Sequence, residues 1–171
     1  IATFYNIQNG LVIGSLPEGH LLIPSLSKFE KIGCFALTER LSGSDAAKGL
    51  KTRAQGYYDG WILNGKKKWV GNSTWCDLSI VWADTNHGIK GFIVDNKSEG
   101  FSVEKIKDKF GLKVCQNGLI TLDSAIVPEE NRLPNKSFKD VLRYTRYLVA
   151  CEATGCQMGA YEHALKYAKE R

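Results

Sequence analysis

The hydrophobic positions in the N-terminal part of the chain fall into short, interrupted clusters. Apolar residues gather at 11–16 and again at 21–26, and Pro17 and Pro24 interrupt this part of the pattern. A proline inside a helix costs about 3 kcal/mol, because it removes a backbone hydrogen bond and clashes with the preceding turn. Residues 1–33 are therefore predicted to form at most short helical pieces, which cannot make a helical bundle by themselves.

From residue 34 to about residue 134 the pattern changes to short β-forming runs separated by turn signals. The turn signals are those typical of hairpins: Asp59-Gly60, Asn64-Gly65, Asn86-His87-Gly88 and Glu99-Gly100. The runs between them lie at 52–58, 61–63, 68–70, 78–83, 91–94, 101–106 and 119–122. Short strands at this spacing predict an antiparallel sandwich or barrel.

The C-terminal part of the chain follows the spacing of a helix. Apolar side chains recur three and four residues apart from Phe138 to Ala168, which predicts one helix of more than 30 residues. Gly155 and Gly159 would let another helix approach closely. The pattern runs to Arg171 without a Gly or Pro stop signal, so we expect this helix to be the first of something larger.

Composition and charge narrow the possible partners. A hydrophobic content of 43% over 171 residues argues against wholesale disorder. The net charge of +5 would suit a polyanion, either nucleic acid or the phosphates of a nucleotide cofactor. The tightest lysine cluster, at 66–68, falls in a turn and strand, so we interpret the lysines as solvated and predict no nucleic-acid partner. No apolar run approaches the ~20 residues of a membrane span.

The usual catalytic and metal-binding patterns are missing from the sequence. The five cysteines are widely spread without a C-x-x-C pair, which predicts reduced thiols and neither a zinc site nor a disulfide framework. The three histidines are isolated, so a triad or a metal site is not predicted. No Rossmann or Walker sequence is present.

Two segments could contact a ligand. Residues 35–45 are a short apolar strand that runs into a loop with hydroxyls, a glycine and an acid. Such a loop can offer N–H groups to a polar ligand, but it also describes an ordinary turn and helix cap. Trp61 and Trp69 flank a predicted turn and could form a wall for a flat aromatic ligand. Alternatively, both indoles pack into the β-core.

Together these two segments resemble the acyl-CoA dehydrogenase family. The family motifs T-E-P-x-x-G-S-D and W-x-x-N-G-x-K-x-W-I-x-N correspond here to T-E-R-L-S-G-S-D at 38–45 and W-I-L-N-G-K-K-K-W-V-G-N at 61–72. Further similar stretches, in the family's order, lie at 109–113, 127–134, 145–147 and 167–171. Residues 69–73 and 116–118 are most similar to the branch of plant peroxisomal short-chain acyl-CoA oxidases and glutaryl-CoA dehydrogenases.

The resemblance implies an α+β fold with three parts. Residues 34–134 would be the middle β-barrel or sandwich domain, which binds flavin and acyl-CoA. It would be flanked by incomplete helical domains, namely a remnant of the N-terminal domain at 1–33 and the first long helix of a truncated C-terminal bundle at 135–171. FAD is the implied cofactor and an acyl-CoA thioester the implied substrate. The full-length form is expected to be a homo-oligomer, located in the peroxisome or alternatively the mitochondrion.

The site residues follow from the motifs by resemblance. The positions expected to bind FAD are Phe35, Ala36, Leu37, Thr38, Ser44, Trp69, Val70, Gly71 and Arg171. The positions expected to bind acyl-CoA are Ser44, Lys139, Asp140, Val141, Leu142, Arg143, Tyr144, Thr145 and Arg146. In the family's reaction a Glu removes the α-proton of the thioester while the flavin takes the β-hydride.

Three positions depart from the family pattern. Arg40 replaces the proline of the first motif, and Gly71 replaces a threonine that dehydrogenases usually carry. Thr145 stands where a minority of members place the catalytic base, and a threonine cannot act as a carboxylate. No catalytic residue is therefore predicted within the chain, and the base is expected beyond Arg171.

Three interpretations of function follow. The leading one is FAD-dependent α,β-dehydrogenation of acyl-CoA thioesters in fatty acid β-oxidation, by a fragment that lacks its base. The first alternative is an inactive, truncated family member that binds acyl-CoA and FAD weakly or pairs with full-length homologues. The second alternative is an unrelated β-sandwich binding module.

Overall fold

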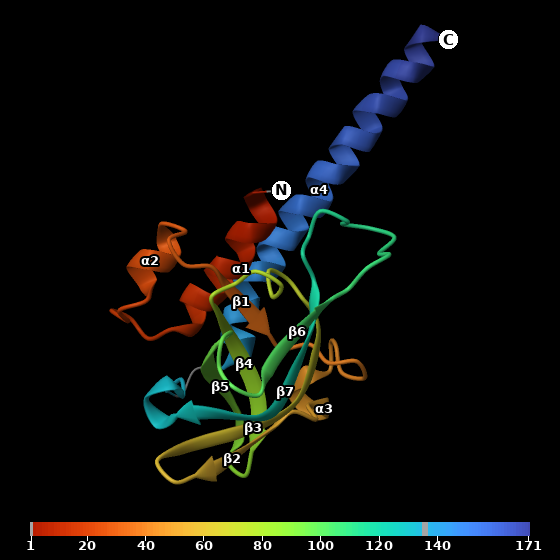
Figure 1. The fold of residues 1–171 in the computed structure, drawn as a ribbon. Coiled ribbons are helices and arrows are strands. Elements are labelled where there is room, and N and C mark those ends of the chain that lie inside the picture. Colours follow the sequence, from red (N-terminus) through yellow and green to blue (C-terminus); the bar gives the residue numbers. More distant parts are fainter. Residues whose placement is uncertain (1, 135–136) are drawn as a thin grey trace. The chain divides into compact units, whose positions relative to one another are not determined.

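A curled sheet of seven strands forms the middle of the chain (Figure 1). The computed structural model describes residues 2–134 and 137–171. In chain order the strands are β1 (Gly33–Ala36), β2 (Arg53–Tyr57), β3 (Gly60–Val70), β4 (Leu78–Thr85), β5 (Gly88–Asp95), β6 (Phe101–Lys105) and β7 (Gly118–Pro128). Their order in the sheet is β1-β4-β2-β3-β7-β6, and β5 pairs with β4. The predicted fold class, with a barrel-like β middle domain, is confirmed as a curled half-barrel.

Helices precede, interrupt and follow the strands. They are α1 (Ala2–Ser15), α2 (Ile23–Ser27), α3 (Ala46–Gly49), the short 3-10 helix η1 (Glu129–Asn131) and α4 (Phe138–Glu170). The chain divides into two compact units, Ile1–Phe138 and Lys139–Arg171. The predicted domain boundary at residue 135 lies outside the described residues. Among the described helices, none is both long and apolar enough to cross a membrane.

The N-terminal helix α1 is longer than the interrupted hydrophobic pattern predicted. It has 14 residues, and its buried side chains include Leu11 and Val12; Leu16, directly after the helix, is buried as well. Gly33 permits close packing of α1 on β1, because a Cβ built on this glycine would lie 2.8 Å from Val12 Cγ2. Tertiary contact with the sheet therefore stabilises a helix that its own sequence specifies weakly.

One buried side chain joins α1, α2 and β1. Asn9 Nδ2 donates to the carbonyl oxygens of Leu26 (2.9 Å) and Lys31 (3.1 Å). The Oδ1 atom of Asn9 accepts from the Gly33 N–H at 2.8 Å. The short α2 carries Pro24 in its first turn, where a proline does not interrupt the hydrogen-bond pattern. Asn9 thereby fixes the N-terminal segment to the start of the sheet.

Strand β3 runs through the second predicted turn, which corrects the sequence-based prediction. Asn64-Gly65 forms an irregularity in the register with β7 instead of a hairpin turn. Gly65 has a φ of +150°, and a Cβ there would lie 2.6 Å from Thr52 Cα. The glycine thus allows two backbones to approach closely, a use that local sequence cannot distinguish from a turn.

Two strand pairings are parallel, although the turn signals predicted an antiparallel domain. β1 pairs with β4 in parallel over all four of its residues, and β2 meets β4 where Arg53 lies opposite Asp84. Parallel neighbours need crossover connections, which leave no short turn signal in the sequence. The other strand pairs are antiparallel, including the hairpins β2–β3 and β4–β5.

The core of the first unit lies along the buried faces of these strands. Its largest fully buried apolar side chains are Trp82, Phe92, Leu16, Leu26, Leu63, Ile80 and Ile120. The Trp82 ring packs against Phe35 and Phe138, with ring centroids 5.9 and 5.6 Å apart. Because β4 carries Trp82 and is buried along almost its whole length, it forms the centre of the domain.

Candidate functional site

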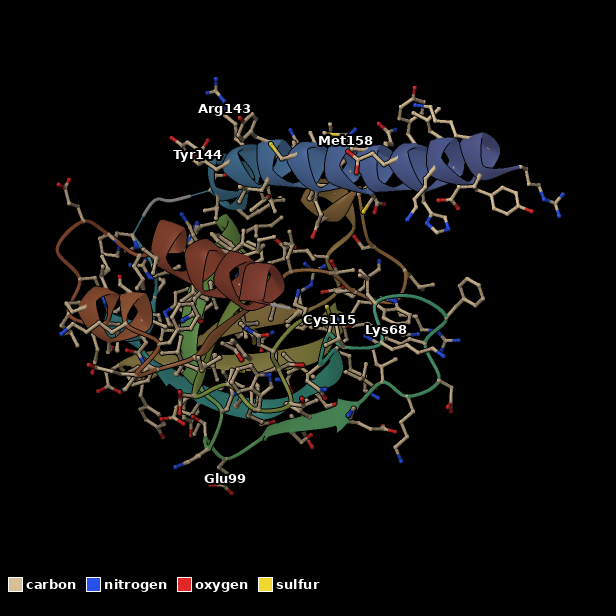
Figure 2. The ribbon with its side chains drawn as sticks, turned by 90° about the horizontal axis from the view of Figure 1, so that it is seen from above. Lys68, Glu99, Cys115, Arg143, Tyr144 and Met158 are labelled. Atoms are coloured by element: carbon tan, nitrogen blue, oxygen red, sulfur yellow. The ribbon has the colours of Figure 1, made fainter. Side chains whose placement is uncertain are left out.

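The two segments singled out in the sequence lie side by side in the structure. The Lys68 N–H donates to the Thr38 carbonyl oxygen at 2.8 Å, which joins the loop after β1 to the end of β3. Thr38 is half-buried, and Trp69 follows directly after Lys68. The loop between β6 and β7 also reaches the end of β3, because Asn117 donates to the Trp69 carbonyl; Lys68 and Cys115 are labelled near each other in the view of Figure 2, and Glu99 is labelled away from both. This junction of the two motifs is the candidate site.

Trp69 has an unusual backbone conformation at this junction. Its φ is +65°, and the β3–β7 register shifts between Lys67 and Val70. A left-handed conformation at a bulky residue costs on the order of 1–3 kcal/mol and persists only where its surroundings hold it. Here the Asn117 Nδ2 donates to the Trp69 carbonyl at 3.0 Å. As a result the indole stays 50% exposed while Val70 turns into the core.

The proposed wall of two tryptophans is wrong. Because β3 is one continuous strand, Trp61 and Trp69 lie near its opposite ends. The Trp61 ring packs against Phe92 at 5.4 Å, and its Nε1 donates to Glu129. Trp61 therefore packs with the core, as the alternative interpretation held, and only Trp69 presents an indole at the junction.

The first predicted segment offers mainly backbone to a ligand. The side chains of Phe35, Ala36 and Leu37 are buried. Beyond Thr38 the chain turns outward, so that Arg40 and Ser44 are exposed. Ser42 closes this loop, because its carbonyl accepts from the Glu39 N–H at 2.9 Å and its hydroxyl donates to Asp45 at 3.2 Å.

Gln8 of α1 touches both predicted cofactor segments, although no sequence motif marks it. Its Oε1 accepts from the Phe35 N–H at 3.1 Å. A Cβ built on Gly71 would lie 3.0 Å from Gln8 Nε2. The departure from threonine at position 71 therefore coincides with a glutamine that fills the adjacent space.

A buried ion pair holds the first loop against β3. Lys67 and Glu39 have side chains 0% and 5% exposed, and Lys67 Nζ lies 2.8 Å from Glu39 Oε1. Lys67 also donates to the Leu37 carbonyl at 3.1 Å. The second oxygen of Glu39 accepts from the Lys51 N–H, and Oε1 accepts from Thr52. Lys67 thus has two acceptors, and both oxygens of Glu39 accept hydrogen bonds, which fixes Thr38 beside Lys68.

The pKa values of this pair reflect burial opposed by hydrogen bonding. Burial lowers the pKa of Lys67 to about 8, although its hydrogen bond to Glu39 works in the other direction. Burial alone would raise the pKa of Glu39. Hydrogen bonds from Lys67, Thr52 and the Lys51 amide outweigh that effect, so the pKa of Glu39 lies below its ordinary value.

The segment that follows Trp69 contains an unsatisfied donor and part of the lining of a cavity. The cavity has a volume of about 680 Å³ and is lined by Thr74, Trp75, Val103, Lys105 and Gln116. The side chain of Asn72 is 3% exposed, and its Nδ2 has no hydrogen-bond partner among the described residues. Buried donors are nearly always paired in native proteins, so this atom marks a place that suits an additional polar group.

The remaining predicted contacts lie on α4, which is a separate unit. Lys139, Asp140 and the residues up to Arg146 form its first turns, and Arg143 and Tyr144 project from the helix (Figure 2). Thr145 Oγ1 donates to the Leu142 carbonyl at 3.0 Å. At the far end the Arg171 guanidinium lies 5.2 Å from the Tyr167 ring centroid. The acyl-CoA contacts of residues 139–146 and the FAD contact of Arg171 stay predictions.

Residues 34–125 match the family described as "Acyl-CoA dehydrogenase, middle domain". This match covers more than half of the chain and contains both motifs of the junction. The chain belongs to the acyl-CoA dehydrogenase family. The predicted family is thereby confirmed, and the reading as an unrelated β-sandwich module is wrong.

Similar family members come from bacteria and a mammal. The chain is 41% identical over 147 residues to the caffeyl-CoA reductase-Etf complex subunit CarC of Acetobacterium woodii, covering 80% of this chain and 38% of that protein. It is 33% identical over 171 residues to the mitochondrial short-chain specific acyl-CoA dehydrogenase of Mus musculus, covering 94% of this chain and 41% of that protein.

A solved structure of similar fold is the glutaryl-CoA dehydrogenase from Mycobacterium smegmatis in complex with FADH2. The TM-score is 0.74 and the identity 34%, with 78% of this chain and 36% of that chain covered. The chain therefore spans about 40% of the length of the acyl-CoA dehydrogenase relatives.

Proposed function

We propose that this chain forms the flavin-facing part of an enzyme that oxidises acyl-CoA thioesters across the α,β carbon–carbon bond with FAD. The observation that carries the proposal is the junction of the two family motifs, where Thr38 and Lys68 are hydrogen-bonded and Trp69 presents a half-exposed indole. The names of the relatives support it. They include dehydrogenases of short-chain acyl-CoA and glutaryl-CoA and a reductase of caffeyl-CoA, all of them CoA thioesters.

The residues at the junction fit a flavin. Trp69 offers a flat aromatic face, Thr38 offers a hydroxyl, and the loop that follows offers backbone N–H groups. The Nδ2 of Asn72 is a hydrogen-bond donor without a partner among the described residues, so it is available to a polar group of a ligand. FAD, when bound, supplies the two-electron redox chemistry of the reaction.

The chain's own residues position and shield this site. The Glu39–Lys67 pair and Gln8 each contact both motif segments and hold them together. The indole of Trp69 excludes water on the face it covers, which strengthens electrostatic interactions there. Thr145 does not act as the base, because it has no carboxylate and its hydroxyl is donated to the Leu142 carbonyl. We assign no base among the described residues.

The experiment measures FAD binding and flavin reduction in the whole protein. Trp69→Ala is expected to weaken FAD binding roughly two- to tenfold, since an aromatic stacking contact contributes about 0.5–1.5 kcal/mol. Tyr58→Ala is the matched control, because this aromatic is 92% exposed in the β2–β3 turn. Equal loss in both variants, or a wild-type protein that takes up no FAD, would contradict the proposal.

A second candidate function is ligand binding without turnover. Arg40 in place of the motif's proline and Thr145 at the alternative base position favour it. Anaerobic addition of acyl-CoA to the FAD-loaded protein separates the two candidates. Bleaching of the flavin supports dehydrogenation, whereas a binding isotherm without bleaching supports the inactive family member.

The finer features of the predicted function belong to this proposal as well. They are a role in fatty acid β-oxidation, membership of the oxidase-like branch, a homo-oligomeric full-length form, and a location in the peroxisome or mitochondrion. A panel of acyl-CoA chain lengths, with oxygen and a carrier flavoprotein as alternative electron acceptors, tests the first two. The native mass and the subcellular distribution test the others.

A further inference from the structure

Two cysteines share a buried polar network that begins directly before the first motif segment. Cys34 lies in β1, and Cys76 lies two residues before β4, the parallel neighbour of β1. Cys34 Sγ is 3.0 Å from Ser79 Oγ, and the Ser79 hydroxyl donates to Asn96 Oδ1 at 2.7 Å. The Asn96 Nδ2 donates to Cys76 Sγ at 2.7 Å. The network thus connects one thiol to the other through Ser79 and Asn96.

The two thiols differ in acidity. The neighbouring Cys34 thiol lowers the pKa of Cys76; burial opposes this, and the hydrogen bond from Asn96 adds to it. Burial raises the pKa of the Cys34 thiol, which Cys76 raises further. Cys76 is therefore the better nucleophile, with a protonated thiol as its neighbour. Redox-sensitive cysteines commonly have a thiolate next to such a resolving thiol.

The two thiols also differ in access. Cys76 lines a cavity of about 610 Å³, whose lining includes His20, Lys31, Asp77 and Asn96. Cys34 is completely buried and is not part of that lining. A small, uncharged oxidant in the cavity would therefore meet Cys76 first.

We propose that Cys76 and Cys34 are a peroxide-sensitive thiol pair. The Cys76 thiolate attacks a small hydroperoxide, so that a sulfur–oxygen bond forms, the oxygen–oxygen bond breaks, and water or an alcohol leaves after protonation. Cys34 then attacks the sulfenic sulfur of Cys76, the disulfide forms, and the hydroxyl leaves as water with the Cys34 proton. In sum, two thiols are oxidised to one disulfide and one hydroperoxide is reduced.

Oxidation of this pair would strain the first segment of the site. Cys34 directly precedes Phe35, whose N–H is bound by Gln8. A disulfide removes the thiolate that accepts from Asn96 and pulls β1 toward the start of β4. The proposal does not depend on the proposed FAD function, because it concerns only thiol chemistry in the first unit.

The test is a peptide map of the whole wild-type protein, treated with limited hydrogen peroxide while folded and then alkylated in denaturant, so that the buried Cys34 can react when it is reduced. The expected result is a joint loss of alkylation at Cys34 and Cys76, with a disulfide between their peptides. It should occur at a peroxide dose that leaves the exposed Cys151 and Cys156 largely alkylated. Oxidation of Cys151 and Cys156 with Cys34 and Cys76 untouched would overturn the proposal.

A pair of variants identifies the attacking thiol. In Cys34→Ser, dimedone is expected to trap a sulfenic acid at Cys76, because the resolving thiol is gone. In Cys76→Ser, no trapping is expected at the buried Cys34. The reverse pattern, or no trapping in a folded Cys34→Ser protein, would contradict the assignment. Where either variant does not fold, the wild-type peptide map decides by itself.

Discussion

At the scale of single residues, the Glu39–Lys67 pair shows how a buried charge can serve a binding site. A lysine with no exposed side-chain surface is rare, and it is tolerated here because its ammonium donates to the Glu39 carboxylate and to the Leu37 carbonyl. Such a pair adds little net stability, since desolvation offsets the attraction between the charges. Its effect is positional, because it ties the loop after β1 to β3.

Removing one partner of this pair is expected to cost far more than removing both. Lys67→Met leaves Glu39 as an uncompensated buried carboxylate and should lower the free energy of unfolding by about 3–5 kcal/mol. Adding Glu39→Gln to that variant should restore much of the loss. Urea unfolding of the two single variants and the double variant measures the coupling. Additive effects of the two substitutions would show that the pair does not interact in solution.

The same pair predicts a dependence of stability on acid. The pKa of Glu39 is lower in the folded protein than the ordinary value of about 4.3, so the unfolded state takes up a proton first as the pH falls. The stabilisation is complete above that ordinary value and is lost as the pH falls through the folded pKa. The advantage of the wild type over Glu39→Gln should therefore shrink from pH 6 to about pH 3. An advantage independent of pH would be the contrary result.

The sequence predicted some site residues and missed others for physical reasons. Thr38 and Trp69 could be predicted from the sequence because a family motif marks each of them, and the structure brings their segments together. The roles of Gln8 and Lys67 could not be predicted, since they come only from tertiary contacts. A glutamine in a weakly patterned helix and a lysine in a run of three carry no local sign of burial or of a partner.

At the scale of elements, β3 is the strand on which the site depends. It pairs with β2 and β7, contains Gly65 at its first irregularity, and carries Trp69 at its second. The hairpins and the long helix α4 followed from local pattern, because turn residues and helical spacing are short-range signals. The irregularity at Gly65 could not be predicted from local pattern, since the dipeptide Asn-Gly occurs both in turns and in bulges.

Two glycine substitutions test the irregularity in β3. Gly65→Ala should destabilise the protein by at least about 1–3 kcal/mol, because φ is positive and the new Cβ would meet the Thr52 backbone. Gly56→Ala in β2 is the matched control, with nothing within 4 Å of a built Cβ. It should be neutral or stabilise by about 0.5–1 kcal/mol. Denaturant unfolding measures both, and similar values would argue against the described backbone conformation.

At the scale of the whole molecule, the chain is one β unit with its own core followed by one long helix. The order of helices, strands and final helix was predictable from pattern. The parallel pairing of β1 with β4 was not, because it joins segments separated by the whole β2–β3 hairpin. The helical spacing predicted α4 but not the exposure of its apolar side chains, among them Tyr147, Val149 and Tyr161.

The division into two units predicts that the first folds without the second. A chain ending at Phe138 keeps the aromatic contact between Trp82 and Phe138 and the whole core of the sheet. It should unfold in one cooperative transition with the denaturant midpoint of the sheet in the full chain. Circular dichroism and tryptophan fluorescence measure this. Loss of cooperativity would show that residues 139–171 complete the core.

The position of Gln8 has a consequence for how relatives of this chain can vary. One side chain of α1 binds the Phe35 amide and fills the space beside Gly71, so positions 8 and 71 are not free to change independently. A threonine at 71 requires Gln8 to move or to be replaced by a smaller residue. Across the family these two positions should therefore co-vary. In a chimera that joins α1 of one member to the sheet of another, the packing between positions 8 and 71 should be disrupted first.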